Sequence, residues 1–385
     1  MGKVHSGIIV SFKLYDIMKL QLFASVFIIF FAACKRNPNN NQLVNSKSGI
    51  SDSLRSKLDS YLSSYVDSGF SGVALVADSN GIIFHKAYNG KDDQVDTSTA
   101  FYIASTRKSF VAEAIMQLQE KGKLSVLDSL GKFFNQVPAD KKGITIHNLL
   151  THTSGLDYCE CTDGETDRER IIKSILALRL KNPIGEKWSY QNENYYLLEF
   201  IVAQISGITF RDYIKENILK PVGMMHTGFW GYEIEIQVKL APMSDSLKSM
   251  PLYKKEFQDG HPRPVLVGGM FSTSTDLYKW TEAIRQRKGL SDSSLVASFK
   301  PYKQAVIHDV NDTAMYYSYG WIPTMVKNKR INVFCTGRED WMMNNRIYML
   351  DNGITILVWS LDKKGPDSDA MATVLSSGML KIFQN

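Results

Sequence analysis

The sequence has few of the features that mark the specialised classes of protein. It contains only four cysteines in 385 residues, which excludes a small scaffold stapled by disulfides. Its 26 glycines and 11 prolines exclude a collagen-like or low-complexity chain. The formal net charge of +6 is mild and no run of five or more Lys or Arg occurs, so we predict no nucleic-acid partner. With 44% hydrophobic residues, the chain is typical of a folded globular protein.

Several catalytic motifs are also absent from the sequence. It has no Gly-x-Ser-x-Gly, so we do not expect the nucleophile elbow of the α/β-hydrolases. HExxH is missing and the seven histidines are scattered, so we predict no metal site. Neither a Walker sequence nor Gly-x-Gly-x-x-Gly occurs, and we expect no cofactor.

One apolar stretch, residues 20–33, is too short to cross a bilayer, which needs about 20 residues. It follows Lys19, ends in small residues and stops at Cys34, which is the pattern of a secretory signal peptide. A short buried helix is the alternative, but the polar segment KRNPNNNQ that follows cannot continue a core. We therefore predict a signal peptide over residues 1–33, with Met18 as a second candidate start.

The rest of the chain predicts a tether over residues 34–50 and one α+β domain over residues 51–385. The segments predicted as helices are Ile50–Tyr65, Ser105–Lys121, Ile146–Leu150, Asp167–Leu180, Glu193–Ile205, Phe210–Leu219, Asp276–Gln286 (with Thr275 as its cap) and Ser368–Phe383. The segments predicted as strands are Gly72–Ala77, Ile82–Ala87, Tyr316–Pro323, Ile331–Gly337, Arg346–Leu350 and Thr355–Leu361.

Strands at both ends of this domain, with helices between them, indicate one antiparallel sheet built from both termini. We expect the terminal helices to flank that sheet. The sheet lobe covers about residues 51–100 and 300–385, and an all-helical inserted subdomain covers about residues 101–299. The active site is expected in the cleft between the two lobes.

The pattern Ser-x-x-Lys occurs three times, beginning at Ser105, Ser129 and Ser360. Residues i and i+3 share a face of a helix, so the lysine can hydrogen-bond the serine Oγ and help to remove its proton. Only Ser105 begins a segment predicted as an amphipathic helix, and a helix N-terminus stabilises developing negative charge. We therefore select Ser105 with Lys108 and interpret the other two as surface coincidences.

The segment Tyr102–Lys108 resembles the nucleophile motif of the serine β-lactamase-like superfamily. It is most similar to the branch of class C β-lactamases, D-alanyl-D-alanine peptidases and family VIII esterases. Five further blocks resemble this family and come in its order: Leu149–Leu156, Pro183–Asn192, Pro221–Thr227, Gly268–Asp276 and Tyr319–Trp321. The resemblance covers about residues 52–382, and it implies the β-lactamase/transpeptidase-like fold.

The resemblance implies covalent acyl transfer by an activated serine. Ser105 is then the nucleophile and Lys108 its proton partner. Tyr190 is the general base and acid, and its phenolate is favoured because a nearby cation lowers the pKa of a tyrosine. Asn192 positions Lys108 and binds the amide of the substrate. Backbone N–H groups of Ser105 and Arg338 form the oxyanion hole.

The block that lines the site from the sheet departs from the family pattern. Members usually carry Lys-Thr-Gly or His-Thr-Gly, where this chain has Cys335-Thr336-Gly337. Thr336 and Gly337 let the strand approach a substrate closely, but Cys335 supplies no cation or imidazole for a substrate carboxylate. We expect Cys335 to be a small buried hydrophobe. Arg338 is a candidate substitute cation, although alternation along a strand directs it to the other face.

Two other features carry no predicted chemistry. His152 belongs to a structural turn of the family, and we interpret it as structural. Cys159 and Cys161 are two ligands short of a metal site, and a bond across one residue would be strained. We assign them no role.

The sequence therefore predicts a serine hydrolase that acts through an acyl-enzyme on a small-molecule or peptide substrate, as an esterase or a peptidase. The four residues Phe31-Ala32-Ala33-Cys34 resemble the bacterial lipobox. This resemblance implies an exported lipoprotein anchored in the cell envelope. One alternative is a true β-lactamase or a peptidoglycan DD-peptidase. Another is a non-catalytic cell-envelope binding protein, although retention of the Ser105 motif argues against it. The sequence leaves the oligomeric state open.

Overall fold

The structure is a computed structural model, which describes residues 52–90, 94–159, 165, 167–229, 238–241, 269–339, 343–361 and 371–384. The predicted signal peptide, the tether and Cys34 lie outside these residues.

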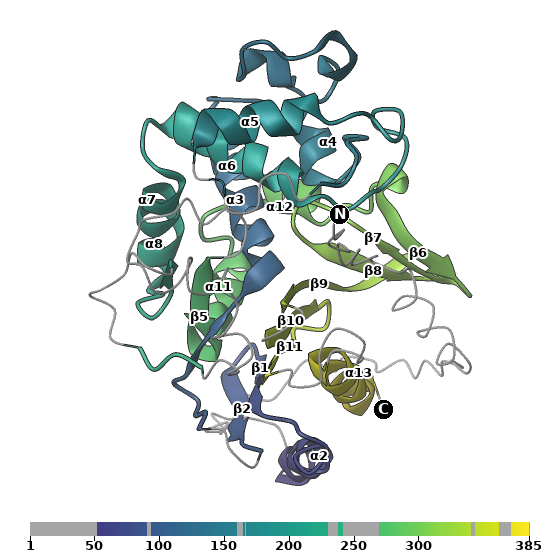
Figure 1. Cartoon of the computed structure of the whole chain (residues 1–385). Coiled ribbons are helices and arrows are strands. Elements are labelled where there is room, and N and C mark those ends of the chain that lie inside the picture. The colour runs from purple at the N-terminus through teal and green to yellow at the C-terminus, as the bar shows by residue number, and fades with distance from the viewer. Residues whose placement is uncertain are drawn as a thin grey trace, which may run out of the picture. The chain divides into compact units, whose positions relative to one another are not determined.

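An eight-stranded antiparallel sheet is built from both ends of the described chain (Figure 1). Its order is β2-β1-β11-β10-β9-β8-β7-β6. The strands are β1 (Gly72–Asp78), β2 (Gly81–Tyr88), β6 (Val306–Val310), β7 (Thr313–Tyr316), β8 (Ile322–Val326), β9 (Lys329–Glu339), β10 (Met343–Leu350) and β11 (Thr355–Leu361). Because β1 pairs with β11, the N-terminal hairpin and the C-terminal strands form one layer, as the sequence predicts.

Helices cover both faces of this sheet. The terminal helices α2 (Asp52–Ser63) and α13 (Met371–Gln384) contact each other, and the Tyr61 hydroxyl donates to the Val374 carbonyl at 3.1 Å. Figure 1 shows α13 on one side of β10 and β11 and α11 (Ser274–Arg285) on the other. The central strands are therefore buried on both faces, and every residue of β11 is buried.

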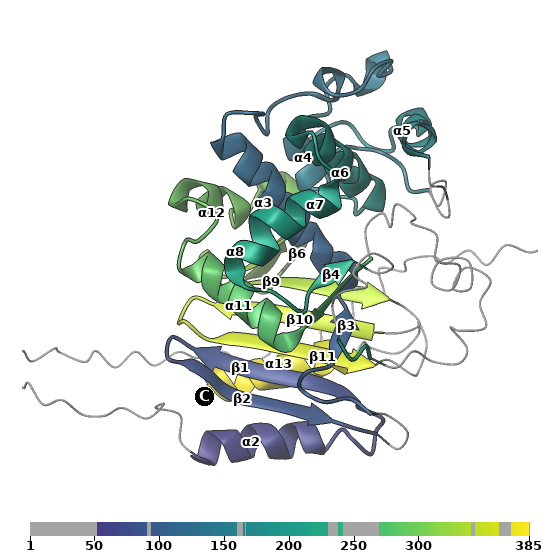
Figure 2. The same cartoon turned by 90° about the vertical axis from the view of Figure 1, so that its left-hand side faces the viewer.

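The insertion between the two halves of the sheet is mainly helical (Figure 2). Its helices are α3 (Arg107–Glu120), α4 (Ile146–Leu150), α5 (Arg168–Ala177), α6 (Asn192–Ser206), α7 (Phe210–Ile214), α8 (Lys220–Val222) and α12 (Asp292–Ser298). Short turns of 3-10 or π helix complete it at Ala104–Thr106, Leu130–Lys132, Ala139–Lys141, Lys215–Leu219 and Lys303–Ala305. The insertion also carries a small sheet that the sequence analysis does not predict, formed by β3 (Ala100–Tyr102), β5 (Met270–Thr273) and β4 (Gly228–Phe229).

Helix α3 is the central helix of the insertion, and it is not amphipathic as predicted. All residues from Arg107 to Leu118 are buried, because α3 packs against α6, α7 and α12. A helix that is surrounded on all sides has no solvent face, which is why polar and charged residues on it are buried too. Lys108, the lysine predicted for the active site, is therefore shielded from water.

Three local predictions are wrong. The cap of α11 is Thr273, whose hydroxyl accepts from the Asp276 N–H at 3.2 Å, so the helix begins at Ser274 and not after Thr275. The predicted strand Tyr316–Pro323 spans the connection between β7 and β8, which turns at Gly320 with φ of 74°. Strand β6 is missing from the prediction because it is an edge strand in which no residue is buried, so its sequence shows no alternation of buried and exposed positions.

Candidate active site

Ser105 lies in a tight turn between β3 and α3. Ala104 before it has φ of 45°, a region in which a residue other than glycine is strained. Ala104 and Thr106 are buried, whereas Ser105 is partly exposed. The helix thus begins after Ser105 rather than at it, and a strained turn leaves Ser105 partly exposed.

The four residues that the sequence analysis selected around Ser105 come together in the structure. Lys108 Nζ donates to Ser105 Oγ at 3.0 Å and to Asn192 Oδ1 at 2.9 Å. The Tyr190 hydroxyl donates to the same Ser105 Oγ at 2.7 Å. Ser105, Tyr190 and Asn192 are partly exposed and Lys108 is fully buried. The hydroxyl of Ser105 is therefore held between an amine and a phenol, next to solvent.

Two packed helices fix this arrangement. Lys108 lies in the first turn of α3, Asn192 is the first residue of α6, and Tyr190 lies two residues before it. The helices contact each other, and a buried ion pair joins Arg107 Nη2 to Glu199 Oε2 at 2.7 Å. The distances around Ser105 are therefore set by rigid elements and not by a loop alone.

Aromatic rings surround the Lys108 amine. Its Nζ lies 4.8 Å from the centre of the Tyr190 ring and 5.8 Å from that of Tyr195, close enough for cation–π attraction. The sequence analysis did not select Tyr195, although its place three residues after Asn192 on α6 puts it on the same helix face. Tyr317, also not selected, lies with its ring centre 6.1 Å from that of Tyr190.

His152 supports the segment that carries Tyr190. Its Nδ1 accepts from the Gln191 backbone N–H at 3.2 Å, and its ring centre lies 4.5 Å from that of Tyr190. Burial, together with the charge of Lys108, holds the pKa of His152 well below its usual range. A neutral imidazole that accepts from the backbone agrees with the structural role predicted for it.

The β9 strand reaches the Ser105 turn at a glycine. A Cβ on Gly337 would lie 2.0 Å from the Ile103 carbonyl oxygen, so only glycine permits this approach. Thr336 next to it is partly exposed, and its hydroxyl donates to the Asn345 carbonyl at 3.0 Å. Arg338 follows and is also partly exposed. The strand thus lies directly against the turn, as the predicted Thr-Gly pair requires.

Cys335 is a buried free thiol, as predicted. It is 3% exposed, and its Sγ contacts the hydroxyls of Ser109 and Thr106. Burial raises the pKa of the thiol to about 12, so it carries no charge near neutral pH. The position where the family usually has a cation or an imidazole therefore supplies neither.

The two other Ser-x-x-Lys sequences form no comparable site among the described residues. Lys132 Nζ pairs with Asp128 at 2.6 Å instead of contacting Ser129. Ser360 is buried in β11, and Lys363 lies outside the described residues. The structure agrees with the interpretation of Ser129 as a coincidence, whereas Ser360 is buried and does not lie on the surface as predicted.

The described part of the chain shows neither a metal-binding cluster nor a membrane-spanning helix. No group of three or more His, Cys, Asp or Glu there is arranged to hold a metal ion. Cys159 is disulfide-bonded, and Cys161 lies outside the described residues. None of the described helices combines the length and apolar composition that a membrane crossing requires.

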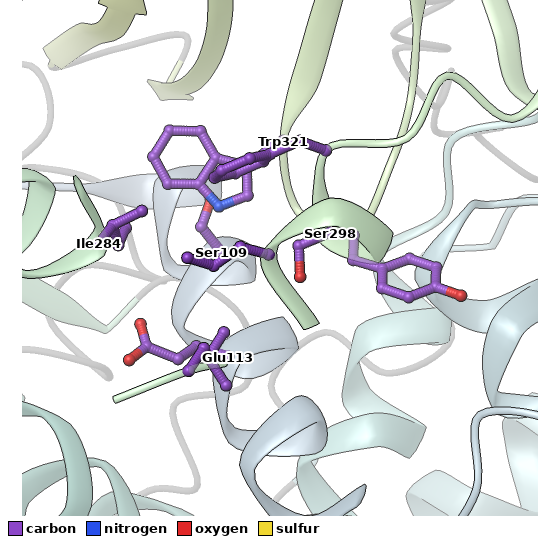
Figure 3. A pocket seen from close by; sticks show the side chains of 9 residues that line it. Ser109, Glu113, Ile284, Ser298 and Trp321 are labelled. Atoms are coloured by element: carbon purple, nitrogen blue, oxygen red, sulfur yellow. The ribbon is translucent and has the colours of Figure 1, made fainter. Parts of the chain in front are cut away.

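A small cavity lies beside α3 (Figure 3). The volume open to the centre of a water molecule is about 10 Å³, which is room for about one water. Ser109 and Glu113 line it from α3, and Trp321 lines it from the segment before β8. The cavity is too small for a substrate, and apolar side chains make up most of its lining around the buried carboxyl of Glu113.

Comparisons with known proteins agree with this fold. The Bacillus subtilis protein PbpX is 32% identical over 250 residues, which span 64% of this chain and 62% of PbpX. Penicillin-binding protein 4* of the same species is 26% identical over 82% of this chain and 72% of its own length.

Solved structures show the same fold. The penicillin binding protein from Bacillus halodurans superposes with a TM-score of 0.68 at 23% identity, over 85% of this chain and all of that one. The D-amino acid amidase from Ochrobactrum anthropi gives 0.69 at 20% identity, over 87% of this chain and 99% of that one. The sequence model of the Beta-lactamase family matches residues 58–376, and the chain therefore belongs to that family.

Proposed function

We propose that the chain is a serine hydrolase that acts through an acyl-enzyme on an ester or an amide. The observation that carries this proposal is the position of Ser105 Oγ, which is 3.0 Å from Lys108 Nζ and 2.7 Å from the Tyr190 hydroxyl. A serine hydroxyl is a weak nucleophile until an adjacent group takes its proton. Membership of the Beta-lactamase family supports the same chemistry.

In the proposed acylation step, Tyr190 acts as a phenolate that the charge of Lys108 stabilises. Tyr190 takes the proton of Ser105, and Ser105 Oγ forms a bond to the carbonyl carbon of the substrate. The bond to the leaving oxygen or nitrogen then breaks, and Tyr190 returns the proton to that atom. A water molecule repeats the sequence on the acyl-enzyme, which releases the acid and restores Ser105.

The negative oxygen of the intermediate needs donors that are already in place. We propose that these are the backbone N–H groups of Ser105 and Arg338. The support for this assignment is the close approach at Gly337, which places the start of Arg338 beside the Ser105 turn. Asn192 is proposed to hold Lys108 and to bind the amide of the substrate.

The neutral thiol of Cys335 favours substrates that have no free carboxylate beside the scissile bond. A thiol with a pKa of about 12 cannot form an ion pair with an anion near neutral pH. We therefore propose a neutral ester or amide as the preferred substrate. Cys335→Lys should improve turnover of a carboxylate-bearing ester relative to its methyl ester, because the variant restores a cation. An unchanged ratio in a folded variant would remove this argument for substrate preference.

A β-lactam-recognising enzyme or a DD-peptidase is the second candidate. The observation in its favour is that a relative similar over most of this chain is named a penicillin-binding protein. Capture of a fluorescent penicillin at Ser105, faster than hydrolysis of a nitrophenyl ester, would favour this candidate over the esterase.

Probe labelling tests the proposed function. A fluorophosphonate should label the wild type and should not label Ser105→Ala. Ser129→Ala is the matched control, because it removes a serine from a second Ser-x-x-Lys sequence and should leave labelling intact. If neither fluorophosphonate nor penicillin labels the wild type, a non-catalytic envelope-binding protein becomes the better account.

We also propose that Cys34 is lipidated and that it anchors the protein in a bacterial cell envelope. The support is the lipobox-like tetrad that ends at Cys34, together with the names of the penicillin-binding relatives. Metabolic labelling with a fatty-acid analogue should mark the wild type and not Cys34→Ser. Equal labelling of the two proteins would contradict the anchor.

A further inference from the structure

One buried amide joins the large sheet to the turn that carries Ser105. Asn345 lies on β10 directly opposite Gly337 of β9, and it is fully buried. Its Nδ2 donates to the Ile103 carbonyl at 3.1 Å, and its Oδ1 accepts from the Thr106 hydroxyl at 2.6 Å. A single side chain therefore holds the residues on both sides of the nucleophile turn.

The turn needs an external support of this kind. Ala104 is strained at φ of 45°, and such a conformation persists only where its surroundings fix it. The turn's own closing bond runs from the Thr106 N–H to the Ile103 carbonyl at 3.0 Å. A carbonyl oxygen has two lone pairs, so the Ile103 oxygen can accept from the Thr106 N–H and from the Asn345 amide at the same time. The second hydrogen bond holds this oxygen in the position that closes the turn.

Thr336 and Gly337 of β9 also contact Asn345 or leave room for it. A Cβ at Gly337 would lie 2.6 Å from Asn345 Nδ2, so a side chain there would displace the amide. The Thr336 hydroxyl donates to the Asn345 backbone carbonyl at 3.0 Å. Gly337 thus opens the path by which Asn345 reaches across β9 to the turn.

We propose that Asn345 is a positioning residue for Ser105, an inference that rests on the proposed function. It acts through the turn and not by contact with the substrate. By fixing Ile103 and Thr106, it sets the direction of Ser105 Oγ toward Lys108 and of the Ser105 N–H toward the reacting carbonyl. The amide fits because it presents a donor and an acceptor on two separate atoms, whereas an ionised carboxylate has no donor and a serine hydroxyl has one oxygen for both bonds.

The effect on acylation should be large, because a displacement of about 1 Å in a catalytic group can cost on the order of 100-fold in rate. We expect Asn345→Ala to lower the rate of fluorophosphonate labelling by about 100-fold, and Asn345→Asp to lower it as well because the donor to Ile103 is lost. Asn332→Ala is the control: it removes another buried asparagine, on the far part of β9, and should leave the rate unchanged.

Thr106, the second partner of the Asn345 side chain, gives a second and milder test. Thr106→Val keeps the shape but removes the hydroxyl that Asn345 accepts from, and should slow labelling about tenfold. Thr106→Ser keeps the hydroxyl and should restore the wild-type rate. If the Asn345 variants do not fold, this pair still decides the question.

Measurements are made well below the melting temperature of the least stable variant, so that loss of fold does not enter. With a nitrophenyl ester, kcat/KM should fall while the pKa values of the pH profile stay unchanged, because Lys108 and Tyr190 are intact. Equal rates for wild type, Asn345→Ala and Thr106→Val would overturn this inference alone. A wild type that no serine reagent labels would overturn the proposed function, and this inference with it.

Discussion

Arg107 and Lys108 are consecutive buried cations in the first turn of α3, and their surroundings differ. Arg107 faces a carboxylate, that of Glu199, at 2.7 Å. Lys108 donates to two neutral oxygens, Ser105 Oγ and Asn192 Oδ1. The carboxylate of Glu199 lets Arg107 tie two helices together. Lys108 instead contacts the hydroxyl of the reacting serine. We therefore call Arg107 the structural cation and Lys108 the chemical cation.

The largest expected effect comes from removing the chemical cation. Lys108→Met should lower kcat/KM for a nitrophenyl ester by about 1,000-fold, because the charge that stabilises the Tyr190 phenolate is lost. The melting temperature should stay the same or rise, since an unbranched apolar side chain replaces a buried charge. A variant that keeps more than a tenth of wild-type activity would show that Lys108 is not the chemical cation.

The structural cation should behave in the opposite way. Arg107→Met leaves the Glu199 carboxylate buried without its partner, which should lower the free energy of unfolding by about 3–5 kcal/mol. The folded fraction should keep its kcat. Denaturant unfolding measures the loss, and the double variant Arg107→Met with Glu199→Leu should recover most of it. A large fall in kcat without loss of stability would reverse the assignment.

A buried anion on another face of α3 extends the comparison. Glu113 Oε2 accepts from Trp280 Nε1 at 2.7 Å, and burial raises the pKa of this carboxyl from 4.5 to about 7. A carboxyl whose pKa is raised on folding contributes stability that is complete below pH 4.5 and is lost as the pH rises through 7. The wild type should therefore lose on the order of 3 kcal/mol across this window.

Glu113→Gln should remove that pH dependence and be the more stable protein at pH 8. Unfolding by urea at pH 4.5 and pH 8 measures the difference directly. If the free energy of unfolding changes equally in wild type and variant between pH 4.5 and pH 8, Glu113 does not titrate in this range. The kcat of the Glu113→Gln variant should equal that of the wild type at either pH, because Glu113 lines the small cavity and is not one of the residues around Ser105.

The smallest effect is expected at Cys335. Because its thiol is neutral, Cys335→Ser changes no charge at the site, and kcat/KM should stay close to that of the wild type. The free energy of unfolding should fall by about 1 kcal/mol, as is usual for a single buried substitution. A collapse of activity in this variant would indicate that the thiol takes part in the chemistry.

The central residues of the site could be predicted because they lie in short motifs. Ser105 and Lys108 are one helical turn apart, and Tyr190 and Asn192 are two residues apart. Each pair is local, and the order of the blocks along the chain then indicates the family fold. The buried thiol of Cys335 was also predictable, from its residue type alone.

The supports of the site could not be predicted in the same way. Asn345 reaches the Ser105 turn from 240 positions away, and its role depends on the register of β10 against β9. Tyr317 lies in a connection that the sequence suggested was a strand. The small sheet of β3, β4 and β5 joins three segments that are far apart in the chain and too short to give a periodic pattern. Such features follow from tertiary packing and leave no local signal.

The central claim is that Ser105 carries an acyl group during turnover. Mass spectrometry of the protein, quenched in acid during hydrolysis of a slow nitrophenyl ester, tests this most directly. The account predicts a wild-type species heavier by one acyl group, with the added mass on the peptide that contains Ser105, and no such species for Ser105→Ala. Hydrolysis by the wild type with no acylated species, or with the acyl group on another residue, would contradict it.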